Sequence, residues 1–201
     1  MTQQTHQGAQ PQHQRLETAK AALAQAMVAS KRSGSSLSPD VDPQYAQAKR
    51  IVLRKLAAAP RSRAQLAEAL AAKQIPEAVA DAVLARMEEV GLVDDEAFAE
   101  MVVRSASQGR GLARRSLAEE LRKRGVSDEI AEQALSPVDD ATERDAARRL
   151  VDKRLRTMGG LEIDVKRRRL AGMLARKGYS SGVVYPVVSE ALAEAVEHRR
   201  D

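Results

Sequence analysis

Three stretches of the chain decide its fold: QLAEALAAKQIPE (65–77), SLAEELRKRGVSD (116–128) and RLAGMLARKGYSS (169–181). Each has leucine at its second and sixth positions, a basic residue near its ninth and an apolar residue at its eleventh. The copies begin 51 and 53 residues apart. Self-similarity at a nearly fixed spacing is the signature of a tandem-repeat protein.

The pattern inside each copy predicts a helix, a tight turn and a second helix. Leucines four residues apart, such as Leu117 and Leu121, lie on one face of a helix. Gly125 follows where a helix commonly ends in a left-handed residue, and Ser127 can cap the next helix. In the first copy Gln74 replaces this glycine. The left-handed conformation costs glutamine about 1 kcal/mol, so that turn could be built differently.

The segments between the copies are predicted to be helical as well. They cover 42–58, 94–108 and 139–157, and each begins with aspartate, a good N-cap. The apolar face of the middle segment consists of Phe98, Met101 and Val102. We therefore predict an all-α fold of nine main helices in three three-helix repeats, stacked into an elongated, curved molecule. The predicted repeats span 42–93, 94–138 and 139–198.

The rest of the sequence indicates an N-terminal extension and the cellular location of the protein. Residues 1–41 are polar and turn-rich, which predicts a disordered or partly helical N-terminal extension and linker, with a short helix inside 15–31. The chain has no cysteine and no apolar run long enough for a transmembrane helix. We expect a protein of the cytoplasm without membrane contact. Glycines in the loops 109–114 and 158–164 could let repeats shift, although glycine also serves ordinary helix ends.

Basic residues are the best candidates for a binding surface. The net charge is +5 and the pI is about 9.7, which favours a polyanionic partner. Segment 104–124 has seven bases and two acids, and segment 143–177 has twelve bases and five acids. The alternative is a solvated helix face with internal salt bridges. The candidate contact residues are Arg104, Arg110, Arg114, Arg115, Arg122, Lys123, Arg124, Lys166, Arg167, Arg168, Arg169, Arg176 and Lys177.

Several stretches carry a family resemblance: RSRAQLAEAL (61–70), GLVDDEAFA (91–99), RGLARRSLAEELRKRGV (110–126) and LAGMLARKGYS (170–180). They resemble the RecX family, bacterial regulators of the RecA recombinase, and the likeness covers roughly 42–196. Its motif residues are expected to be mainly structural: Gly91, Leu92, Asp94, Asp95, Phe98, Leu117, Leu121 and Gly125.

The resemblance implies a function in homologous recombination, DNA repair and the SOS response. A RecX-like protein would bind the groove of the RecA–single-stranded DNA filament, with its basic residues toward the DNA phosphates. It would hinder ATP hydrolysis, filament growth and strand exchange. We expect such a regulator to be a monomer.

Two other classes of function were weighed against this one. Residues 61–93 also read like a helix-turn-helix or winged-helix transcription regulator. A winged helix needs a β-hairpin after residue 93, where the sequence predicts a capped helix. No catalytic constellation, metal-ligand spacing or nucleotide-binding motif is present in the sequence, so we expect neither an enzyme nor a cofactor.

Overall fold

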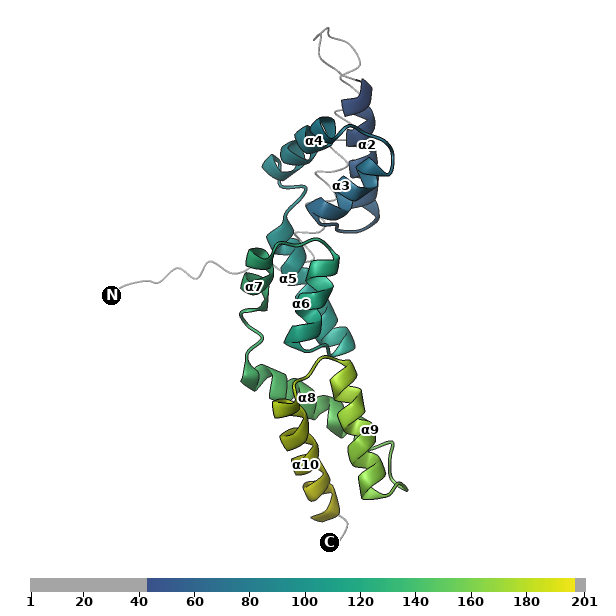
Figure 1. The fold of residues 1–201 in the computed structure, drawn as a ribbon, viewed down its shortest axis with the longest axis vertical. Helices are drawn as coiled ribbons and strands as arrows, with labels where there is room; N and C mark the ends of the chain where they lie inside the picture. The colour runs from purple at the N-terminus through teal and green to yellow at the C-terminus, as the bar shows by residue number, and fades with distance from the viewer. Residues whose placement is uncertain (1–42, 198–201) are drawn as a thin grey trace, which may run out of the picture. The chain divides into compact units, whose positions relative to one another are not determined.

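The structure, a computed structural model, describes residues 43–197 of the 201-residue chain. Within this range it contains nine α-helices, one π-helical turn and no β-strand, which confirms the predicted all-α fold (Figure 1). The helices form two compact units that meet in the chain between Val93 and Asp94. The predicted disorder of residues 1–41 and the predicted helix inside 15–31 lie outside the described residues.

The first unit contains repeat 1, which has a core of its own. Its helices are α2 (Pro43–Ala58), α3 (Arg63–Ala71) and α4 (Glu77–Glu89). The side chain of Ser62 accepts a hydrogen bond from the Gln65 amide, and the Gln65 side chain accepts one from the Ser62 amide, so α3 begins with a capping box. The core is apolar and includes Val52, Leu66, Leu70, Val83 and Leu84.

The second unit contains the other two repeats. The elements of repeat 2 are α5 (Asp95–Ser105), the π-helical turn η1 (Ala106–Arg110), α6 (Arg114–Lys123) and α7 (Asp128–Leu135). The elements of repeat 3 are α8 (Asp140–Leu155), α9 (Ile163–Arg176) and α10 (Ser181–Glu197). Helix α10 packs against both α8 and α9, and α5 packs against α7 (Figure 1). The exact limits of the repeats stay predictions.

The turn between the second and third helices is built in the same way in all three repeats. Gly125 and Gly178 have φ angles of 73° and 91°, and Gln74 takes the same left-handed conformation with φ 58°. The suspicion of a different turn at Gln74 is therefore wrong. The residue after each turn donates its backbone N–H, at 3.2 Å, to the carbonyl of the repeat's second leucine: Leu70, Leu121 or Leu174.

The motif residues around the start of repeat 2 have structural positions. Gly91 ends repeat 1 with φ 69°, and Leu92 is half-buried. Asp94 caps α5 by accepting a hydrogen bond from the Ala97 amide at 2.9 Å. Asp95 is the first residue of α5.

The apolar face of α5 differs from the prediction at one residue. Phe98 is buried, as are Leu117 and Leu121 on α6, and all three belong to the core of repeat 2. Met101 was predicted on the same buried face. That prediction is wrong, because Met101 is 36% exposed. The buried face runs instead through Phe98, Ala99, Val102 and Val103.

The winged-helix alternative fails on the secondary structure. Residues 95–105 form α5, so the β-hairpin that a wing requires is not formed there. None of the helices in the described range is long and apolar enough to cross a membrane.

Candidate functional site

Repeats 2 and 3 are fastened together at one loop, residues 106–113. The Ala113 amide donates to the Lys177 carbonyl at 2.9 Å, and the Lys177 ammonium donates to the Arg110 carbonyl. The hydroxyl of Tyr179 donates to the Gly111 carbonyl at 3.3 Å. Burial, with a smaller contribution from the charge of Glu143, raises the pKa of Tyr179 to about 12, so this hydroxyl keeps its proton. Loop 109–114 is therefore held by three hydrogen bonds to the end of α9 and the turn after it, and a shift of the repeats at its glycines would have to break them.

Two glycines let the repeats approach this closely. Gly111 has φ 61°, and a β-carbon added there would lie 2.9 Å from Leu150 Cδ1 of α8. Such a distance is shorter than real β-carbon contacts, so a side chain at residue 111 would require the Leu150 side chain to shift, in addition to the cost of the left-handed backbone. Gly178 packs in the same way against Ser116 of α6.

The junction also shares its apolar core between repeats. Ala113 belongs to repeat 2 by sequence, but it is buried in the core cluster of repeat 3 with Val151 and Leu174. The residue at the same repeat position in repeat 3 is Lys166. Its side chain is only 8% exposed, so its prediction as a surface contact is wrong. The apolar stem of a lysine can be buried in this way along apolar neighbours.

A basic groove lies beside the junction, and we call it the junction groove. It encloses ≈ 720 Å³ between loop 106–113, α8 and the end of α9. One acid, Glu143, lines it, and the Arg114 amide donates to that carboxylate at 2.7 Å. The bases that line the groove are Arg110, Arg149, Lys153, Arg154 and Lys177.

Helix α8 directs its bases to two different sides. Arg149 and Lys153 are four residues apart, share one face and line the junction groove. Arg148 instead binds Asp152 at 2.9 Å and the Glu194 carboxylate of α10. The hydrogen bonds to Glu194 and Asp152 raise the pKa of the Arg148 guanidinium. Arg148 therefore joins α8 to α10, whereas Arg149 and Lys153 form no ion pair with a carboxylate among residues 43–197.

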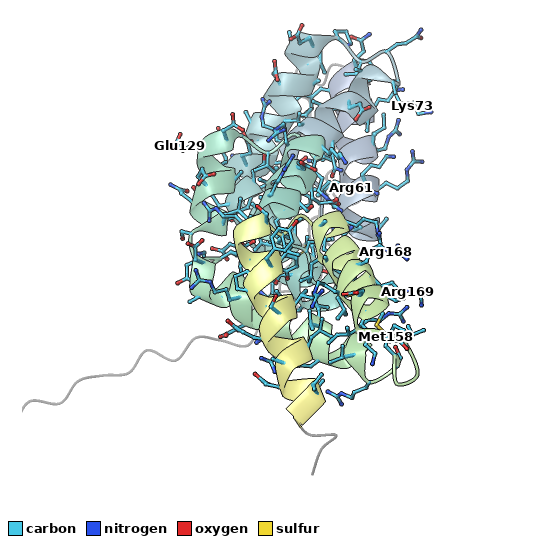
Figure 2. All side chains as sticks on the ribbon, turned by 60° about the horizontal axis from the view of Figure 1, so that its bottom comes forward. Arg61, Lys73, Glu129, Met158, Arg168 and Arg169 are labelled. Atoms are coloured by element: carbon cyan, nitrogen blue, oxygen red, sulfur yellow. The ribbon has the colours of Figure 1, made fainter. Side chains whose placement is uncertain are left out.

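Helix α9 continues the basic surface. Met173 and Lys177 line the junction groove, and Arg169 lies one turn before Met173 on the same helical strip. Arg168 and Arg169 are exposed, and Figure 2 shows them projecting outward from α9, away from α10. In the same view Glu129 of α7 points away on the other side of this unit. Arg168 and Arg169 are thus open to solvent on the outer side of α9.

Two further predicted contact residues have roles inside repeat 2. The Arg114 guanidinium donates to the carbonyls of Leu135 and Val138 at the end of α7, and pairs with Glu132 at 2.6 Å. Arg124 donates twice to Glu120, at 2.7 and 3.1 Å, and its guanidinium lies 6.0 Å from the centroid of the Phe98 ring. Both side chains hold repeat 2 together, because each bonds to a neighbouring element or ring. Their assignment to the contact surface stays a prediction.

The other predicted contact residues divide into paired and unpaired groups. Arg104, Arg110, Arg115 and Arg167 each lie within 4 Å of a carboxylate, at 3.9, 3.5, 3.5 and 2.7 Å respectively. Surface ion pairs of this kind contribute little to stability, so these arginines stay available to a partner. In the described part of the chain no ion pair is formed by the remaining exposed bases: Arg122, Lys123, Arg168, Arg169 and Arg176.

The sequence reasoning missed Arg149, Lys153 and Arg154 as site residues. Their spacing on one predicted helix was a usable signal, because residues 149 and 153 are one turn apart. The sequence did not show which face of α8 lies toward the 106–113 loop of repeat 2. Arg148, one residue earlier, carries the same side chain and points elsewhere.

Comparison with known proteins identifies the family. Three family models match the chain: RecX, first three-helix domain, over 48–87; RecX, second three-helix domain, over 94–135; and RecX, third three-helix domain, over 142–188. In the solved structure of RecX from Lactobacillus salivarius, 96% of that chain aligns with 73% of this one at a TM-score of 0.65 and 21% identity. That likeness shows the fold alone.

Relatives with the name regulatory protein RecX match most of the chain. The Streptomyces coelicolor protein is 52% identical over 159 residues, which cover 79% of this chain and 84% of that protein. The Thermobifida fusca protein is 50% identical over 165 residues, which cover 82% and 88%. These proteins are named as regulators and not as enzymes, in agreement with the prediction of a non-enzymatic protein. With three domain models and close relatives over most of its length, the chain belongs to the RecX family of regulatory proteins.

Proposed function

We propose that this protein binds the RecA–single-stranded DNA filament in its groove and inhibits the recombinase. It would lower the rate of ATP hydrolysis, filament growth and strand exchange. The observation that carries the proposal is the junction groove, where five bases face one acid. A partner of this kind places the protein in the cytoplasm, and we expect it to act as a monomer.

The charges of the junction groove suit a phosphate backbone. Glu143 already accepts a hydrogen bond from the Arg114 amide, so it offers little competition for the bases around it. Arginine donates two parallel hydrogen bonds to a phosphate, and lysine acts as a point charge. Each phosphate bound in this way releases counterions, which makes the affinity depend on salt.

The test is an inhibition titration of RecA ATPase activity on single-stranded DNA. The variant carries Arg149→Ala and Lys153→Ala, which removes two groove bases and leaves the Arg148 bridge intact. We expect the inhibitory concentration to rise at least tenfold, which corresponds to about 1.4 kcal/mol. The slope of log affinity against log salt should become shallower by about 1.4, because single strands contribute about 0.7 per phosphate contact.

A matched control removes the same charge elsewhere. Arg122→Ala and Lys123→Ala take two exposed, unpaired bases from the end of α6, outside the junction groove. We expect this variant to inhibit within about threefold of the parent. Circular dichroism is the check that both variants are folded. Equal inhibition by the groove variant, the control and the parent at low and high salt would refute the role of the groove.

A further inference from the structure

One arginine occupies the same position in each repeat, three residues before the first leucine. These residues are Arg63, Arg114 and Arg167. In the first two repeats the arginine clamps an acid on the third helix. Arg63 Nη2 lies 2.9 Å from Asp81 Oδ1, and Arg114 Nη2 lies 2.6 Å from Glu132 Oε2. Asp81 and Glu132 are themselves at equivalent positions of the repeat.

Repeat 3 keeps the arginine and lacks the clamp. The position of Asp81 and Glu132 is taken by Tyr185, so Arg167 has no acid on α10 at that place. Helix α10 also continues to Glu197, whereas α7 ends at Leu135 and leaves its last carbonyls free for Arg114. Helix α9 begins one turn earlier than α6, and Arg167 pairs there with Asp164 of its own helix at 2.7 Å.

Both members of the altered pair are open to solvent. The side chain of Tyr185 is 67% exposed, the largest exposure among the exposed large hydrophobic residues of the described chain, and Arg167 is 51% exposed. The residues one turn from Tyr185 on the surface of α10 are small and uncharged: Ser181, Gly182 and Ser189. A β-carbon added at Gly182 would meet only Ser180 Oγ, at 3.8 Å. The helix therefore leaves the surroundings of the ring uncrowded.

We propose that Tyr185 and Arg167 form a nucleotide-binding site for single-stranded nucleic acid, in which the ring stacks on a base and the guanidinium binds a phosphate. Single-strand binding proteins combine exposed aromatic rings with basic side chains, because every base has a π-face. Arg167 and Tyr185 occupy the repeat positions at which the arginine and the acid are in contact in repeats 1 and 2. Arg167 is the basic member of this pair, and its ion pair with Asp164 is at the surface, where it contributes little and leaves the guanidinium available to a phosphate. The choice of ligand rests on the proposed function, but the site is tested without RecA.

The base-stacking half of the site is tested with two oligomers of equal length and charge. One is oligothymidine and the other is the same backbone with abasic residues throughout. The parent should bind oligothymidine about tenfold more tightly, because only that oligomer can stack. Tyr185→Ala should abolish the preference, and Tyr185→Phe should keep it. Val196→Ala is the matched control, since it removes an exposed apolar side chain three turns away on α10 and should keep the preference.

A spectroscopic measurement supports the same assignment. The chain has no tryptophan, so Tyr185→Trp introduces a single reporter at the site. Oligothymidine should quench its fluorescence, and the abasic oligomer should not. Equal affinity of the parent for both oligomers, or a preference that survives in Tyr185→Ala, would overturn the stacking site.

The phosphate half is tested by comparing two equivalent arginines. Arg114→Ala should lower the thermal midpoint, because Arg114 holds the end of α7. Arg167→Ala should leave the thermal midpoint unchanged. It should weaken the binding of both oligomers about equally, by roughly threefold to tenfold. A loss of thermal stability in Arg167→Ala as large as that in Arg114→Ala would show a structural residue and overturn its role in binding.

The outcomes separate this site from the proposed function. If the parent inhibits RecA but has no preference for bases, the nucleotide site falls and the proposed function stands. If the base preference is present and RecA is not inhibited, the proposed function falls and the nucleotide site stands. If Tyr185→Ala keeps the base preference but loses inhibition, Tyr185 contacts the recombinase, and the nucleotide proposal is overturned.

Discussion

Gly178 of repeat 3 lies directly against Ser116 of repeat 2: a β-carbon at residue 178 would stand 2.3 Å from Ser116 Oγ and 3.0 Å from the Ser116 backbone nitrogen. The same glycine has φ 91°, a left-handed conformation. Two independent reasons, backbone conformation and lack of space, therefore demand glycine here. The turn of one repeat and the second helix of its neighbour fit only without a side chain.

Gly178→Ala should destabilise the second unit strongly. The left-handed backbone alone costs about 1–2 kcal/mol, and the clash with Ser116 adds to it. Gly91→Ala is the control, because Gly91 has φ 69° but a β-carbon there would meet nothing within 4 Å. Urea unfolding should show a clearly larger loss for Gly178→Ala than for Gly91→Ala. Equal losses would mean that the junction relaxes without cost.

Gln74→Gly should stabilise repeat 1. Among residues 43–197, Gln74 is the one residue other than glycine with a positive φ, at 58°. Glycine removes the cost of that conformation, so we expect a gain of about 1 kcal/mol in the free energy of unfolding. Gln133→Gly inside α7 is the opposite case and should cost about 1 kcal/mol. An unchanged or lower thermal midpoint for Gln74→Gly would contradict the claim that the left-handed conformation of Gln74 costs stability.

Acid should weaken repeat 2 through Glu120. The hydrogen bond from Arg124 holds the pKa of this carboxyl below its ordinary 4.5, burial opposes the shift, and the charge of Arg110 lowers it further. The unfolded chain then binds the proton more readily, so this contribution is complete above pH 4.5 and is lost as pH falls through the lower folded pKa.

The measurement for Glu120 is a series of thermal midpoints between about pH 6 and about pH 3, a range that brackets the titration of the Glu120 carboxyl. Glu120→Gln should be less stable than the parent at the upper end, and the difference should shrink toward the lower end. Glu119→Gln serves as the control, because its partner Arg115 is 82% exposed and the pair is 3.5 Å apart. A gap between parent and Glu120→Gln that stays constant with pH would contradict the coupling.

Lys166 should matter for stability and not for inhibition. Lys166→Ala removes the buried stem, which should cost roughly 2 kcal/mol of unfolding free energy at about 0.8 kcal/mol per methylene. Lys166→Met keeps most of the stem and should stay close to the parent. Both folded variants should inhibit RecA within about twofold of the parent. A tenfold loss of inhibition in Lys166→Met would restore this lysine to the contact surface.

The sequence was sufficient for the repeat and for the two turns that contain glycine, because those depend on local rules, whereas it did not predict that Gln74 takes the same left-handed conformation. Leucine spacing predicts the buried faces, and Gly125 marks a left-handed turn that the structure contains. The prediction for Met101 failed because Met101 lies at the edge of the face that Phe98 and Val102 bury, and one residue along a helix is enough to reach the solvent-exposed side. A face inferred from three apolar residues is uncertain by about one position.

The candidate site was only partly predictable, because side-chain direction depends on packing between repeats. Arg148 and Arg149 are adjacent and identical, yet one bridges to Glu194 and the other lines the junction groove. The repeated arginine was visible in the sequence, since Arg63, Arg114 and Arg167 precede equivalent leucines. What the sequence could not show is which of these arginines has an acid within reach on the third helix.

The exchange of Ala113 into the core of repeat 3 has an evolutionary consequence. Ala113 is the residue that repeat 2 contributes to the core of the next repeat. At the equivalent position repeat 3 carries Lys166 instead of a small residue. A fourth unit added at the C-terminal side would meet a filled, charged position in place of alanine. Lengthening of this lineage by gene duplication would therefore need a second mutation at codon 166 before the new unit could pack.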